Sequence, residues 1–161
     1  MICMNNKKSY TGIFKIYGLY VIIILIFLDY LSKFYAYKLL ASKKIDLLSD
    51  FIYLELYKNK WIAFSMNLPF LKIITITIIG AILYYYIKYE KPKNNKFLNI
   101  SYILIISGAL WNAWERIFLW EVTDFIWVKF FSVFNLADIY ISIWIILYLI
   151  IIVLKKDNEC V

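Results

Sequence analysis

Four long apolar runs limit what this chain can fold into. They cover about residues 13–31, 68–87, 97–113 and 139–154, in a chain that is 64% hydrophobic. A helix needs roughly 20 mostly apolar residues to cross the hydrocarbon core of a bilayer. The sequence therefore predicts a single integral membrane domain, residues 1–161, of the all-α membrane class with four transmembrane helices.

The basic residues indicate how these helices are oriented. The net charge is +7, and lysines gather before the first run, between residues 88 and 96, and after the fourth run. An even number of spans places these three groups on one side, where basic residues mark the cytoplasm, although the opposite segments hold nearly as many. We expect both termini in the cytoplasm of a multi-pass protein, and no nucleic acid as partner.

The residue types that are missing exclude several kinds of chemistry. The chain has no histidine, and its two cysteines, Cys3 and Cys160, lie near opposite ends. Without histidine, Ser-His and Cys-His catalysis and histidine-ligated zinc are excluded. Any reaction must depend on carboxylates, lysine, serine, asparagine or arginine.

Polar side chains converge on one membrane face. The end of the first run, the start of the second, the end of the third and the start of the fourth all meet there, because successive spans alternate in direction. Those places carry "DYLSK" (29–33), "NKWIAF" (59–64), "WNAWER" (111–116) and "FNLAD" (134–138). Helical spacing of i,i+3 and i,i+4 within these stretches directs their polar side chains to common faces. The sequence predicts a polar pocket at this face and nothing comparable at the other.

The segment between the first two runs, about residues 34–66, is expected to form a small extracytoplasmic platform of β-strand and amphipathic helix beside the pocket. "KLLASKKIDLL" (38–48) has helix-like spacing that suits an amphipathic helix in the membrane interface. "DFIYLELYKN" (50–59) alternates apolar and polar residues, which is typical of a strand.

Two acids stand out among the polar groups. Asp29 with Lys33 is most simply a salt bridge at a helix end, and Glu115 with Arg116 suits a charge pair at the membrane interface. By contrast, Asp124 and Asp138 have no cation at helical spacing. If the two carboxyl groups lie close together they cannot both ionise cheaply, so they would share one proton, as in an aspartic protease.

Five short motifs, in order, resemble those of lipoprotein signal peptidase, also called signal peptidase II. They are "DYLSK" for D-x-x-S/T-K, "NKWIAF" for N-x-G-x-A-F, "GALWNAWER" for a glycine-rich G-N-x-x-D-R, "VTDF" for V-x-D-F, and "FNLAD" for F-N-x-A-D. The resemblance extends over nearly the whole chain. It implies a bacterial cytoplasmic membrane enzyme with an extracytoplasmic aspartyl dyad that cleaves diacylglyceryl-modified prolipoproteins before the lipidated cysteine.

The resemblance also implies roles for individual residues. Asp124 and Asp138 correspond to the catalytic dyad, and Asp29 with Lys33 to a supporting pair. The family's polar residues that line the site and hold substrate or dyad correspond to Asn59, Asn112, Arg116 and Asn135. The family uses no metal or organic cofactor, and we expect a monomer whose partners are prolipoprotein substrates and membrane lipid.

Three positions depart from the family pattern. Trp61 and Trp111 stand where the family has glycine, and Glu115 stands where it has aspartate. The pocket is expected to be ringed by Phe64, Trp111, Phe125 and Phe134. Two other classes remain open at this stage: a small transporter or channel subunit with an acidic ion path, and a catalytically silent lipoprotein-binding relative.

Overall fold

Four helices form the body of the protein. The computed structural model describes residues 11–49, 51–60, 71–90 and 95–158. The helices are α1 (Thr11–Leu40), α2 (Leu71–Tyr85), α3 (Lys96–Phe118) and α4 (Leu136–Asn158), and a π-helical segment, η2 (Tyr86–Glu90), continues α2. All four are long and apolar enough to cross a membrane. The predicted four-helix membrane architecture is therefore confirmed, with α1, α3 and α4 longer than the apolar runs.

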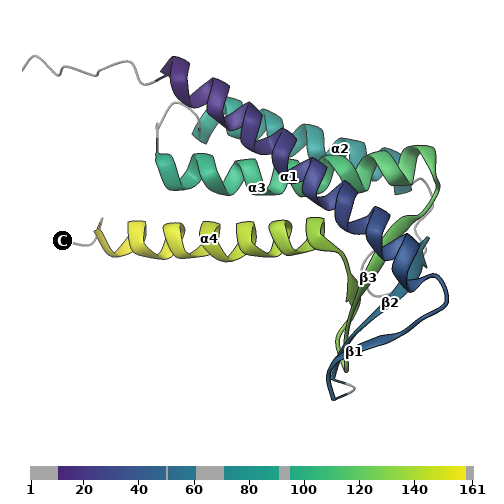
Figure 1. Ribbon diagram of the computed structural model, residues 1–161. Coiled ribbons are helices and arrows are strands. Elements are labelled where there is room, and N and C mark those ends of the chain that lie inside the picture. The colour runs from purple at the N-terminus through teal and green to yellow at the C-terminus, as the bar shows by residue number, and fades with distance from the viewer. Residues whose placement is uncertain (1–10, 50, 61–70, 91–94, 159–161) are drawn as a thin grey trace, which may run out of the picture.

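Helix α3 is the central helix, because it packs against α1, α2 and α4 (Figure 1). Its approach to α4 depends on Gly108. A Cβ atom on Gly108 would lie 2.5 Å from the backbone oxygen of Ala137, too close for any other residue without a shift of the helix. The missing side chain thus brings the start of α4 against the last turns of α3, which is where the polar motifs lie.

Four strands form one antiparallel sheet at one end of the helices. They follow in chain order as β1 (Ile45–Leu48), β2 (Ile52–Asn59), β3 (Val122–Val128) and β4 (Val133–Phe134). The strand predicted within residues 50–59 is confirmed as β2. The interfacial helix predicted over residues 38–48 is wrong: residues 38–40 are the end of α1, and after a short loop the chain enters β1, which pairs with β2.

The sheet is fixed to the helices by a small apolar core. Ala36 and Leu40 of α1 pack with Phe125 of β3, and Leu54 and Leu56 of β2 add to the cluster. Figure 1 shows the strands running across the helix direction and reaching past α4 on one side. This attachment holds β3 over the ends of α1, α3 and α4.

Candidate active site

Lys33 is the centre of a buried charge network at the sheet end of the bundle. Its ammonium group lies 2.8 Å from Oδ2 of Asp29 and 2.5 Å from Oε2 of Glu115, and it donates to Oδ1 of Asn112 at 2.8 Å. All four side chains are buried. Asp29 also accepts a hydrogen bond from the backbone N–H of Ala137 at 2.8 Å. One lysine and its partners therefore join α1, α3 and the first turn of α4.

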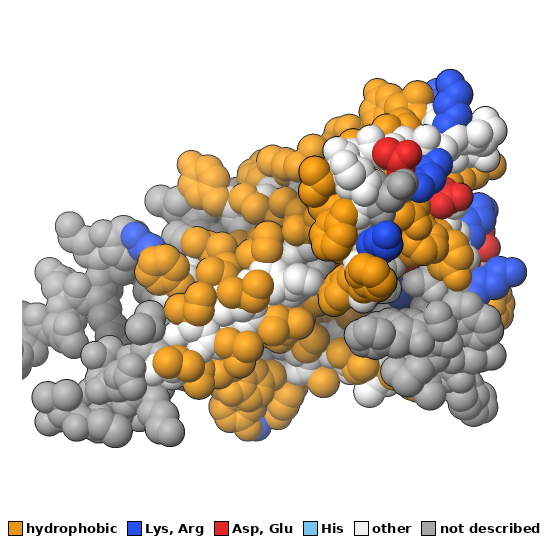
Figure 2. Space-filling view, turned by 90° about the horizontal axis from the view of Figure 1, so that it is seen from below, with side chains coloured by type: hydrophobic (Ala, Val, Ile, Leu, Met, Phe, Trp, Pro, Cys, Tyr) orange, Lys and Arg blue, Asp and Glu red, His pale blue; other side chains and the backbone are white. Residues whose placement is uncertain are grey.

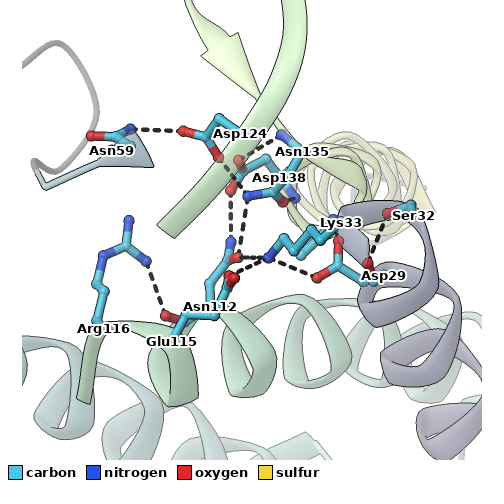
Figure 3. Close-up of polar contacts among 11 residues, drawn as sticks. Asp29, Ser32, Lys33, Asn59, Asn112, Glu115, Arg116, Asp124, Asn135 and Asp138 are labelled. Atoms are coloured by element: carbon cyan, nitrogen blue, oxygen red, sulfur yellow. Dashed lines mark hydrogen bonds and ion pairs between the residues drawn. The ribbon is translucent and has the colours of Figure 1, made fainter. Parts of the chain in front are cut away.

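Lys33 also determines how Asn112 is oriented. An ammonium group can only donate, so the amide of Asn112 must turn its oxygen toward Lys33. Its nitrogen is then directed to the other side, where Nδ2 donates to Oδ1 of Asp138 at 2.9 Å (Figure 3). The charge network thus extends through the amide of Asn112 to Asp138.

Asn135 links Asp138 to the other acid, Asp124. Its side-chain oxygen accepts from the backbone N–H of Asp138 at 3.1 Å, while its own backbone N–H donates to Oδ2 of Asp138 at 3.2 Å. This reciprocal pair is a capping box at the start of α4. The amide nitrogen of Asn135 remains available for Oδ1 of Asp124, at 2.7 Å. Asn135, which is fully buried, therefore bonds to both carboxyl groups.

Asp124 lies in the middle of β3, between β2 and the helices. Asn59, near the end of β2, donates to Oδ2 of Asp124 at 2.8 Å. The pKa of Asp124 is raised to about 6, and burial is the largest cause. The nearby charge of Asp138 acts in the same direction, whereas the hydrogen bonds from Asn59 and Asn135 oppose the rise. A carboxyl group with this pKa can hold or release a proton near neutral pH.

Both acids open onto one cavity of about 430 Å³. Asn59, Arg116, Asp124 and Asp138 form its polar end. The rest of its wall is largely apolar and comes from the segment after β3 and from α4: Phe131, Ser132, Val133, Phe134, Ile139, Ile141, Ser142, Ile143 and Ile146. Figure 3 shows the guanidinium of Arg116 pointing toward Asn59, while Arg116 donates to the backbone oxygen of Asn112 at 3.5 Å. The site thus combines two carboxyl groups, one cation and an apolar channel along a membrane helix.

The residues predicted for the site lie together, but some of the expected neighbours do not. Glu115 pairs with Lys33 rather than with Arg116, because it is buried toward α1. Trp111 stacks on Trp114 at 4.9 Å and lines a separate apolar groove beside α1, so this bulky residue lies outside the cavity. Phe125 belongs to the apolar core.

Among the other residues predicted to surround the pocket, Phe134 does line the cavity. Trp61 and Phe64 lie outside the described residues. In the part of the chain that the structure describes, no group of three or more acidic or cysteine side chains could hold a metal ion.

Sequence reasoning missed two features. The apolar wall on α4 is one: Ile139, Ile143 and Ile146 follow helical spacing, but an apolar face on a membrane helix cannot be distinguished from lipid-facing surface. The second is Glu90, a single acid that is buried at the opposite end of the helices. It lies within the basic segment 88–96, whose composition gives no sign of burial.

The fold and the site together define an integral membrane enzyme with paired carboxyl groups at one end of a four-helix bundle. A family model described as signal peptidase (SPase) II matches residues 21–154. The chain belongs to the signal peptidase II family and is a membrane protease. Membership of this family does not favour the transporter alternative.

Known proteins agree with this assignment. A lipoprotein signal peptidase of Clostridium acetobutylicum is 36% identical over 143 residues, which is 83% of this chain and 92% of that protein. One of Listeria welshimeri is 33% identical, over 76% of this chain and 84% of that protein. Among solved structures, a bacterial membrane enzyme determined at 2.3 Å by the in meso method matches with a TM-score of 0.73 and 25% identity, covering 88% of this chain and 90% of that one.

Loss of the Lys33 charge should unfold the site. In Lys33→Met the carboxylates of Asp29 and Glu115 stay buried without their cation, and we expect a loss of about 3 to 5 kcal/mol in the free energy of unfolding. Adding Glu115→Gln should restore part of it, because one of the two buried charges is then removed. Unfolding in mixed micelles measures both effects.

The matched control is Lys58→Met. Lys58 pairs with Glu121 at 2.5 Å, but it is half exposed, so its removal should cost about 1 kcal/mol or less. Equal losses for the two lysines, or no rescue by Glu115→Gln, would contradict the network.

Proposed function

We propose that this protease is an aspartic endopeptidase that removes signal peptides from diacylglyceryl-modified prolipoproteins, cleaving before the lipidated cysteine. The observation that carries the proposal is the cavity that Asp124 and Asp138 share. The two carboxyl groups come from different elements, and Asn135 donates a hydrogen bond to each of them. The names of the relatives support the choice of substrate.

Hydrolysis by this pair requires one shared proton. The ionised carboxyl group takes a proton from a water molecule as the water oxygen attacks the scissile carbonyl carbon, while the protonated carboxyl group donates its proton to the carbonyl oxygen. The resulting gem-diol collapses when its C–N bond breaks. The carboxyl group that took the water proton gives it to the leaving amine nitrogen of the cysteine, and the other carboxylate takes a proton from one hydroxyl group of the gem-diol, which restores the starting dyad. The donors Asn59, Asn112 and Asn135 hold the two carboxyl groups in place throughout.

The wall of the cavity suits a substrate that arrives through the membrane. Ile143 and Ile146 on α4 lie toward the membrane interior from Asp138, and both are exposed on the lipid-facing side of the helix. Acyl chains or the apolar part of a signal peptide could lie along this wall with the peptide bond at the carboxyl groups. Arg116, at the polar end, is placed to bind a carbonyl or an ester oxygen of the substrate.

The orientation follows from the reaction. Signal peptides of exported proteins are removed after the chain has crossed the membrane, so the sheet and the site should face the extracytoplasmic side and both termini the cytoplasm. The basic segments at the opposite ends of the helices support this direction. Every group of the site comes from one chain, so a monomer suffices.

Replacing either acid should abolish cleavage. We expect Asp124→Asn and Asp138→Asn each to reduce kcat/KM by about 10⁴-fold, with little further loss in the double variant, because residues that act as one unit are not additive. Asp46→Asn is the control, since Asp46 pairs with Lys44 on the exposed strand β1. Two small, independent losses would show that the acids do not share a site and would favour a silent relative.

The pH dependence should respond to Asn59. Cleavage should decline as the pH rises and the shared proton is lost, and the pKa of Asp124, about 6, contributes to this limb. The N–H donor of Asn59 stabilises the ionised carboxylate, so Asn59→Ala should raise that pKa and move the decline to higher pH, by about one unit for a hydrogen bond to a charged group.

Profiles of kcat/KM against pH test this shift. Glu55→Gln, an exposed change on the same strand, is the control and should leave the profile in place. A shift of the Asn59→Ala profile to lower pH would contradict the role assigned to this hydrogen bond.

A further inference from the structure

The end of the sheet farthest from the helices carries exposed apolar side chains. Phe130 and Phe131, in the turn between β3 and β4, are 92% and 73% exposed. Next to them lie three more exposed apolar residues: Leu47 and Leu48 at the end of β1, and Phe51 in the turn between β1 and β2. The backbone N–H of Lys129 donates to the oxygen of Phe51 at 2.8 Å, so the two turns lie together. We call these five apolar residues the sheet tip.

The sequence of the turn does not suit a position in water. Phe130 has a φ of 66°, in the left-handed region where glycine or asparagine is favoured and a bulky residue is strained. Glycine or asparagine would relieve this strain, and asparagine would also be better solvated. Two exposed phenylalanines at such a turn are therefore best explained by an apolar environment outside the protein.

The direction of the strands shows what that environment is. Because the strands cross the helix direction and pass α4 (Figure 1), a bilayer spanned by the helices runs alongside the sheet, and the tip overhangs lipid next to α4. Figure 2 looks onto this side and shows hydrophobic side chains on both the helical body and the projecting sheet, with charged groups among them on the sheet.

The tip is also continuous with the surface of a membrane helix. Phe131 lines the same cavity as Ile143 and Ile146, which lie on the exposed side of α4. Beside the phenylalanines, the ammonium of Lys129 lies 5.5 Å from the centre of the Phe130 ring. Aromatic rings next to lysine are typical of the boundary between acyl chains and headgroups.

We propose that the sheet tip inserts into the interfacial layer of the adjacent leaflet, with Phe130 and Phe131 among the upper acyl chains and Lys129 at the lipid phosphates. The insertion of the sheet tip does not depend on catalysis. It has a consequence that rests on the proposed function: the inserted turn is flanked by β3, which carries Asp124, and by β4, which leads to Asp138. Lipid contact at the turn therefore fixes the height of both carboxyl groups above the membrane.

Quenching of a fluorescent label in lipid nanodiscs tests whether the sheet tip is inserted in lipid. An environment-sensitive fluorophore is attached at Lys129→Cys, with Cys3 and Cys160 replaced by serine, so that both phenylalanines are kept. The nanodiscs contain phosphatidylcholine and phosphatidylglycerol, some of it carrying a nitroxide at the top of the acyl chain, and iodide is the quencher in water. The control label is at Glu55→Cys, an exposed position in the middle of β2.

We expect nitroxide lipid to quench the label at residue 129 several-fold more than the label at residue 55, and iodide to show the reverse order. Phe130→Ser in the labelled chain should abolish the difference, and Phe130→Leu should keep it. Equal access of iodide to both labels would overturn the proposal, and so would protection from both quenchers, which would place a second copy on the tip. Undiminished cleavage of substrate by the Phe130→Ser chain would overturn the link between the tip and the two carboxyl groups and leave the proposed function standing.

Discussion

The ammonium group of Lys33 is the interaction on which the rest of the site depends. It is buried at the sheet end of the helices among two carboxylates and an amide, where an unpaired charge of either sign would be costly. Asp29 holds the start of α4 through a backbone N–H, and Asn112 passes the orientation on to Asp138. A cation that makes no direct contact with the proposed dyad in the structure therefore sets both the packing of three helices and the direction of a hydrogen bond to one of its members.

The site is built where a membrane bundle meets a small sheet, and neither part could supply it alone. The helices provide a low-dielectric support, with Gly108 permitting close approach of α3 and α4. The sheet provides Asp124 from β3 and Asn59 from β2. Asn135 stands at the junction: as the cap of α4 it needs a polar side chain, and the same side chain bonds to Asp124. Local helix capping and the proposed chemistry thus use one residue.

Much of this arrangement could be predicted from the sequence, because apolar runs and alternating spans fix which motifs share a face. The four helices, strand β2 and the grouping of Asp29, Lys33 and the asparagines follow from such local patterns. Strand β3 was not predicted, since its sequence "VTDFIWV" does not alternate strictly between apolar and polar residues and the strand gains its stability from pairing with β2. The pairing of Glu115 with Lys33 joins residues 82 positions apart, for which helical spacing carries no signal. For the same reason the burial of Glu90 and of Phe125 could not be foreseen.

In the proposed reaction, the two carboxyl groups act on a lipid-bearing precursor that reaches them through the membrane. Each methylene buried in a bilayer contributes about 0.8 kcal/mol, so two acyl chains localise a substrate more strongly than any single peptide contact. The most direct measurement compares cleavage of one prolipoprotein with and without its diacylglyceryl group, by the wild-type protein and by Asp138→Asn, in nanodiscs at equal bulk concentration. The account predicts rapid cleavage before the cysteine only for the lipidated form and only by the wild type. Equal cleavage of the lipidated and bare precursors would contradict it.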